Sequence, residues 1–165
     1  ADLYDFIEKG ANHPISLSLA EINFAIKNEY VDLLWKKIYS RKSFDKDGAI
    51  TACKTLVETA LKHLLDEKKI DHSNKDDIRD LFKKVSKNYG LEPGKQKSAE
   101  FTQLCSGYIS IINSISAIRN KYGDAHGKSK QIIFDLKQNY IDIVINMTGS
   151  IVTFLLSLVE KKEEN

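Results

Sequence analysis

The sequence is poor in the residues that interrupt helices and that cross-link chains. Two prolines and eight glycines in 165 residues leave long helices easy to build, and disorder is not expected. Cys53 and Cys105 are too few for a zinc set, and we interpret them as buried thiols in a reducing cytosol. The predicted location is therefore cytoplasmic. A net charge of +2 neither requires nor excludes nucleic acid as a partner.

Long apolar runs are also missing. The longest, residues 151–159, is about half of what spans a bilayer, so we interpret it as part of a buried core helix and expect no membrane partner. No secretory signal opens the chain. The hydrophobic content of 42% and charged content of 29% are those of a soluble globular protein with one sizeable core. The first residue is Ala, not Met, and one interpretation is a piece of a longer protein.

Helical periodicity runs through the chain. Apolar residues recur three and four positions apart, and no stretch alternates as a strand does. The five expected helices cover about residues 18–41, 48–68, 74–89, 99–121 and 136–159, and residues 2–9 are expected to form a short amphipathic turn or helix. Expected N-caps are Ser18, Asp47, Ser73 with Asp76, Ser98, and Asp135 with Gln138, and Gly90 is an expected helix stop. We therefore predict an all-α bundle of four to five helices.

The expected helix that ends near residue 121 carries a heptad-like apolar seam. Its members are Leu104, Tyr108, Ile111, Ile115, Ile118 and Tyr122, separated by alternating steps of four and three. A seam of this kind packs against another helix, in the same subunit or in a partner subunit. It makes a dimer geometrically plausible.

Chemistry-bearing residues gather where this helix ends, in the stretch 119–127. Arg119 and Asn120 fall in its last turn, and Gly123 lets the chain turn back so that His126 can approach Arg119. Gly127 leaves the backbone beside the imidazole open to a ligand. The rest of the chain is typical of a scaffold.

These groups suit phosphodiester cleavage without a metal. An imidazole with an unperturbed pKa of about 6.5 gives and takes protons near neutral pH, and a guanidinium grips a phosphate with two prongs. In RNA the 2′-hydroxyl can attack its own phosphate, so the protein need not supply a nucleophile. One chain offers one histidine here, and two copies facing each other across a two-fold axis would supply both a base and an acid. No carboxylate cluster suggests a metal site, and no cofactor is expected.

A structural interpretation of the same residues is also open. An Arg in the last turn of a helix is favoured by the helix dipole alone. His126 could simply cap carbonyl groups in a loop. His63 is interpreted as a structural residue, and His13 and His72, which fall in expected loops, as solvent-exposed residues.

The motif is similar to that of a known family. Arg119-Asn120 followed by His126 resembles the Arg-x(4–6)-His signature of HEPN domains, and the string AIRNKYGDAHG resembles the abortive-infection C-terminal branch. Residues 49–65 and 81–93 resemble two further blocks of that branch. The resemblance covers roughly residues 45–160, so we predict a HEPN-like domain over 45–165. Residues 1–44 would be an N-terminal helical segment that packs on it.

The resemblance implies a dimeric bundle that cleaves RNA without metal in an anti-phage or toxin system. Arg119 would bind the scissile phosphate, His126 would act as general acid or base, and Asn120 would hold the supporting polar position. Supporting or RNA-binding roles fall to Asp124, Lys121, Lys128, Lys130 and Glu58. For Glu58 a salt-bridged helix face is the alternative, and for Asp124 a turn cap.

Other functions stay open from the sequence. The domain could bind nucleotide, RNA or a partner protein without cutting, or it could regulate a longer defence protein. Possible partners beyond RNA and a second copy are an antitoxin and an additional N-terminal domain.

Overall fold

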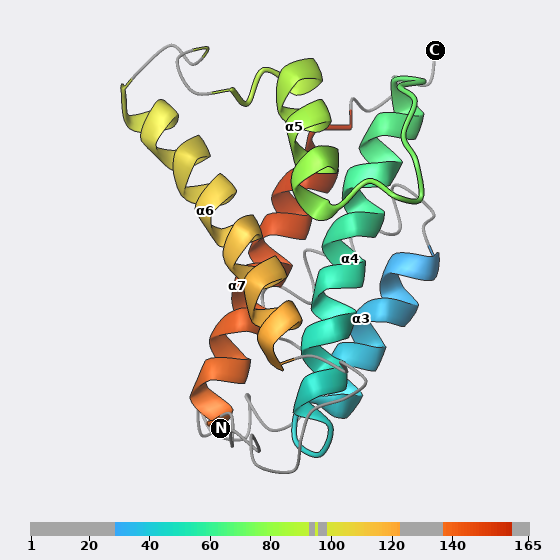
Figure 1. The fold of residues 1–165 in the computed structure, drawn as a ribbon, viewed down its shortest axis with the longest axis vertical. Helices are drawn as coiled ribbons and strands as arrows, with labels where there is room; N and C mark the ends of the chain where they lie inside the picture. Colours follow the sequence, from blue (N-terminus) through green and yellow to red (C-terminus); the bar gives the residue numbers. More distant parts are fainter. Residues whose placement is uncertain (1–28, 93–94, 96–98, 123–136, 160–165) are drawn as a thin grey trace, which may run out of the picture.

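The computed structural model describes residues 29–92, 95, 99–122 and 137–159. Within these residues it contains five α-helices and no strand (Figure 1). The predicted all-α class is confirmed. The expectations for residues 2–9, the Ser18 cap and the Ser98 cap lie outside the described residues.

Helix α4, Lys46–Glu67, is the centre of the bundle, and the four other helices pack around it (Figure 1). Its apolar residues cover most of its circumference, which is typical of a helix surrounded by protein. Those that are buried include Ala49, Ile50, Ala52, Cys53, Leu56, Val57, Ala60, Leu61, Leu64 and Leu65. The helix ends at Glu67 with Lys68 as its C-cap, close to the predicted end.

The N-cap of α4 is Asp45, not the predicted Asp47. The Asp45 carboxylate accepts a hydrogen bond from the Gly48 N–H at 2.9 Å and pairs with Arg41 at 3.4 Å. Asp47 lies in the first helical turn, where its charge still suits the helix dipole. The sequence offers two aspartates here, and the turn after the preceding helix decides which one caps.

Helix α3, Glu29–Arg41, packs along α4. Its buried face consists of Val31, Leu34, Trp35 and Ile38. The Trp35 ring lies edge-on to Tyr39, with centroids 5.1 Å apart, so the only tryptophan of the chain is a core residue.

Helix α5, Ile78–Tyr89, is capped by Asp77 and Asp80, which form a capping box. The predicted Ser73 cap is wrong, because Ser73 and Asp76 instead bond to one another inside the loop before the helix. Gly90 ends the helix in the left-handed conformation with φ of 68°, as predicted.

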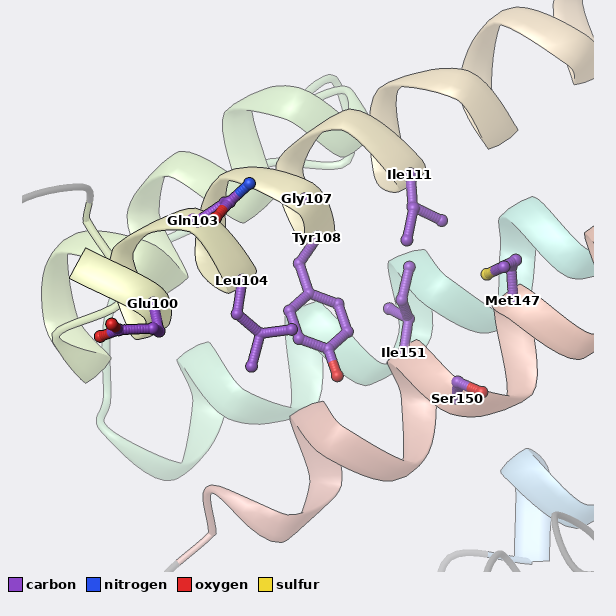
Figure 2. Close-up of a pocket in the computed structure, with 9 residues that line it drawn as sticks. All are labelled: Glu100, Gln103, Leu104, Gly107, Tyr108, Ile111, Met147, Ser150 and Ile151. Carbon is purple, nitrogen blue, oxygen red and sulfur yellow. The ribbon is translucent and has the colours of Figure 1, made fainter. Parts of the chain in front are cut away.

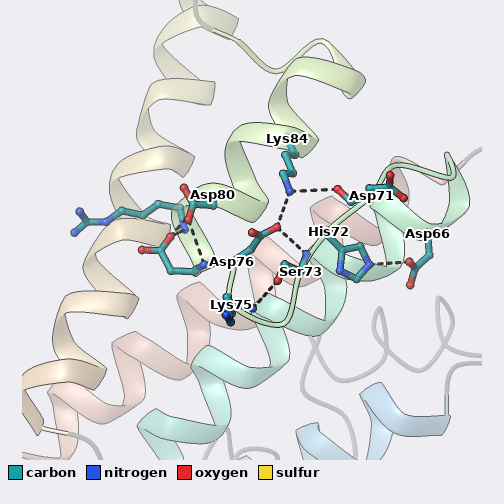
Figure 3. Close-up of polar contacts among 10 residues, drawn as sticks. Asp66, Asp71, His72, Ser73, Lys75, Asp76, Asp80 and Lys84 are labelled. Atoms are coloured by element: carbon teal, nitrogen blue, oxygen red, sulfur yellow. Dashed lines mark hydrogen bonds and ion pairs between the residues drawn. The ribbon is translucent and has the colours of Figure 1, made fainter.

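The loop between α4 and α5 also holds His72. This residue was predicted to be solvent-exposed, but its side chain is mostly covered. Its Nε2 lies 2.8 Å from the Asp66 carboxylate, and its side chain is 18% exposed (Figure 3). The loop is therefore tied to the end of α4 by a polar contact that spacing alone does not reveal.

Helices α6, Ala99–Tyr122, and α7, Gln138–Ser157, complete the bundle. Helix α7 begins with Lys137 as N-cap and without a side-chain cap, so the predicted Asp135 cap is wrong. By length and composition alone α7 could cross a membrane, but it packs against α4 with its apolar face buried in the core. The Thr148 hydroxyl sits in this face, donates to the Val144 carbonyl oxygen at 2.8 Å, and hydrogen-bonds with Cys53 of α4.

Candidate functional site

The predicted catalytic stretch begins in the last turn of α6. Arg119, Asn120 and Lys121 belong to this turn, and the helix ends at Tyr122. The Asn120 side chain is exposed, as a residue that meets a ligand must be. For Arg119 and Lys121 only the helical backbone belongs to the described part of the chain. The predicted end of this helix is correct to one residue.

The other half of the predicted site lies outside the described residues. This applies to His126 and Asp124 and to the two lysines Lys128 and Lys130. The approach of the imidazole to Arg119 therefore stays a prediction, as does the role of Asp124.

Glu58 lies on the side of α4 that faces α3. It pairs with Lys54 at 3.4 Å and lines a hollow of about 410 Å³. The other lining residues are Tyr30, Thr55, Thr59, Lys62, His63 and Asp66, all from α3 and α4. The Nε2 of His63 is buried and has no hydrogen-bond partner among the described residues. The described contacts of Glu58 are those of a salt-bridged helix face, and its supporting role stays a prediction.

The apolar seam of α6 faces α7 but is only partly covered. Figure 2 shows Leu104, Tyr108 and Ile111 pointing from α6 toward Met147 and Ile151 of α7, around a hollow of about 460 Å³. The Tyr108 ring stacks on Phe154 of α7 with centroids 4.6 Å apart. Ile115 is buried, whereas Leu104 is 51% exposed. The Leu104, Tyr108 and Ile111 part of the seam therefore faces α7 of the same chain, while α6 as a whole packs most extensively on α4, and one end of the seam is left open.

Sequence reasoning missed an exposed apolar stripe on α7. Tyr140, Ile143 and Met147 are 53%, 52% and 39% exposed and are spaced three and four apart, so they share one face. The C-terminal end of α6 and the N-terminal end of α7 lie at the same end of the molecule (Figure 1). The stripe thus starts at the end where Arg119 lies. The spacing of three and four between these residues could have predicted the stripe. It was overlooked because the more numerous apolar residues of the buried face lie beside it in the sequence.

The described residues include no group of three or more His, Cys, Asp or Glu side chains placed to hold a metal ion. They do include a cationic groove between α5 and α6, which the sequence marked only by scattered lysines. In the described part of the chain, polar residues gather at the end of α6, in the α3–α4 hollow, in this groove and in the α4–α5 loop around Asp76 and Lys84.

The fold and the polar end of α6 define an all-α helical-bundle domain. The chain belongs to the HEPN-like domain family Abi_C, whose model matches residues 30–159. The predicted resemblance is confirmed, and the match supports a role in abortive infection. The match begins in α3 and so includes part of the predicted segment 1–44, and the division at residue 44 stays a prediction. Searches of the curated proteins and of the solved structures found no match.

Proposed function

We propose that this protein is a metal-independent endoribonuclease of a bacterial abortive-infection or toxin system. The observation that carries the proposal is the family match over residues 30–159, within which Arg119 and His126 keep the Arg-x(4–6)-His spacing. The position of Arg119 in the last turn of α6, beside the exposed Asn120, supports it.

In this proposal each residue has one task. The Arg119 guanidinium binds the scissile phosphate and stabilises the negative charge that grows in the transition state. The His126 imidazole takes the proton from the 2′-hydroxyl or gives one to the departing 5′-oxygen. Asn120 positions the phosphate or the imidazole. The 2′-oxygen bonds to phosphorus as the bond to the 5′-oxygen breaks, which leaves a 2′,3′-cyclic phosphate and a 5′-hydroxyl.

We further propose that two copies form the site together. The reaction gains from a base and an acid, and one chain supplies one histidine in the motif. The exposed stripe of Tyr140, Ile143 and Met147 gives a second copy an apolar surface at the end of the molecule where α6 ends. A two-fold axis there would bring two motifs face to face.

The test is cleavage of total RNA and of transfer RNA in buffer with EDTA. We expect the wild-type protein to cut and both Arg119→Ala and His126→Ala to lose at least about a hundredfold in rate, since each removes one transition-state contact. Products should carry the cyclic phosphate, and DNA should resist because it lacks the 2′-hydroxyl.

The matched control is His72→Ala, which removes an imidazole from the α4–α5 loop and should leave cleavage unchanged. Circular dichroism checks that all variants stay helical. If the Arg119→Ala, His126→Ala double variant cuts RNA as fast as wild type, the assignment is wrong. Saturable RNA binding without any cleavage would favour a non-catalytic binding module.

A further inference from the structure

A groove of about 580 Å³ runs between α5 and α6, within the usual size of ligand sites. Its α5 wall carries Arg79 and Lys83, one turn apart and both exposed. Lys95, also exposed, adds a third cation, and Glu92 is the single acidic residue of the lining. The groove therefore has an excess of positive charge and selects for anions.

Within the described part of the chain, the cations of this groove are not used to hold the fold together. Among the described residues, the side chains of Arg79, Lys83 and Lys95 form no ion pair or hydrogen bond. Lys84, the neighbour of Lys83, is by contrast bonded to Asp76. Cations gathered in a hollow and left unpaired favour a bound anion over a structural role.

The floor of the groove supplies a second, independent observation. Ser86 is 6% exposed, and its buried Oγ has no hydrogen-bond partner among the described residues. A buried hydroxyl without a partner is destabilising, so an oxygen or a bridging water that reached it would be stabilised. Beside it lie Phe82 and Ile109, which give an apolar surface, and Asn113, which gives an amide.

The α6 residues that line the groove lie on the same face of the helix as Asn120 of the proposed cleavage site. Ile109 and Asn113 are four residues apart, and Asn120 follows seven residues later, so the three share one face of α6. Asn113 and Asn120 are about 10 Å apart along the axis at about 1.5 Å per residue. A strand held at the proposed cleavage site can thus continue into the groove.

From this arrangement we infer that the α5–α6 groove binds backbone phosphates of the RNA strand next to the cleaved linkage. The inference rests on the proposed function for the identity of the strand. In this complex Arg79, Lys83 and Lys95 contact phosphate oxygens. Asn113 and the apolar surface of Phe82 and Ile109 contact the sugar or the base.

The experiment measures binding without cleavage. All proteins carry His126→Ala, and the probe is a short fluorescein-labelled single-stranded RNA followed by anisotropy over a range of KCl concentrations. Adding Arg79→Gln and Lys83→Gln should weaken binding at least about tenfold. The slope of log Kd against log salt should fall by about 1.4, since each phosphate contact on a single strand contributes about 0.7.

The matched control removes the same charge elsewhere through Lys37→Gln on α3 and Lys75→Gln in the loop before α5, both exposed. It should leave affinity and slope nearly unchanged. A second variant, Asn113→Asp, keeps the shape of the groove and adds a negative charge, so it should also weaken binding. Its control is Asn74→Asp, an exposed residue in the loop before α5 that does not line the groove.

Three results would overturn the inference: no measurable binding by the parent, equal loss in the groove variants and their controls, or no loss in the groove variants. Inorganic phosphate, compared with KCl at equal ionic strength, should compete with RNA for the parent more than for the Arg79, Lys83 variant. Because cleavage is not read, failure of the catalytic proposal and failure of the groove are separate outcomes.

Discussion

The Lys84 ammonium lies 2.6 Å from the Asp76 carboxylate and joins α5 to the loop that precedes it (Figure 3). The same Asp76 oxygen accepts from the Ser73 N–H at 3.0 Å, and Lys84 also donates to the Asp71 carbonyl oxygen at 3.2 Å. One lysine thus fixes the loop that sets where α5 begins. Lys83, one position earlier, lines the groove instead.

This contact predicts a pH dependence of stability. The hydrogen bond from Lys84, and then that from Ser73, lowers the pKa of Asp76 below its ordinary value. A carboxylate with a lowered pKa stabilises the fold above its unfolded pKa and loses that effect as the pH falls through the folded value. Asp76→Asn should therefore be less stable than wild type at neutral pH, and the gap should close in acid.

Urea denaturation at neutral, weakly acidic and strongly acidic pH measures the gap. Asp71→Asn is the control, since Lys84 bonds to the Asp71 backbone and not to its side chain. Equal stability of Asp76→Asn and wild type at neutral pH would show that the Lys84 contact contributes nothing.

The Cys53 thiol is predicted to be inert in the folded protein. It is fully buried between α4 and α7, and burial raises its pKa to about 12, with a smaller opposing effect of the hydrogen bond with Thr148. In a Cys105→Ser variant, a thiol-reactive dye should label the protein only once urea unfolds it. Stoichiometric labelling of the folded variant would contradict this.

The same thiol predicts loss of stability in alkali. Its folded pKa lies above the ordinary value of 9.0, so the unfolded chain releases the proton first. The contribution of the buried Cys53 thiol to the free energy of unfolding is complete below pH 9 and declines as the pH rises toward 12. Cys53→Ala should remove this part of the alkaline decline, as denaturation curves would show.

Two glycines should respond in opposite ways to the same substitution. A methyl group on Gly48 would meet the Asp45 carboxylate and the Arg41 guanidinium, which cap α4. Gly48→Ala should lower the free energy of unfolding by up to about 1 kcal/mol, because loss of the cap outweighs the gain in helix propensity. Gly107, in α6, has open space around the same position. Gly107→Ala should raise stability by about 0.5–1 kcal/mol, because alanine favours helix.

Thermal and urea denaturation of the two alanine variants give both signs in one experiment. Stabilisation by Gly48→Ala would mean that the Asp45 cap can move aside without loss. A destabilised Gly107→Ala would mean that this face of α6 is covered in solution.

The proposed dimer predicts that a charge on the α7 stripe separates the copies. Ile143 is 52% exposed, so Ile143→Asp should leave the monomer folded. A two-fold interface on this stripe would bury Ile143 of both copies. Losing both isoleucines should weaken association by at least about a hundredfold. Light scattering after size-exclusion chromatography should show a monomer, and RNA cleavage should fall with it.

The control is Leu33→Asp, a residue that is 61% exposed on α3, a helix that packs on α4 and has no substantial packing on α7. It should keep the wild-type mass. If the Ile143→Asp variant still forms a dimer, the stripe of Tyr140, Ile143 and Met147 on α7 is not the interface.

Much of the scaffold could be predicted from local pattern. The end of α4, the Gly90 stop and the end of α6 are correct because a helix terminus depends on neighbours within a few residues. Two of the three wrong caps, Asp47 and Ser73, failed because several capping side chains lie close together and the adjoining turn selects among them.

The sequence by itself determined the helical class, the family and the residues that carry the proposed chemistry, because periodicity and a short motif are properties of neighbouring positions. Only the tertiary structure decided that Arg79 and Lys83 face Asn113 across a groove. It also decided that Tyr140, Ile143 and Met147 stay exposed while the opposite face of α7 is buried. Such relations join residues far apart in the chain, and packing around α4 fixes them.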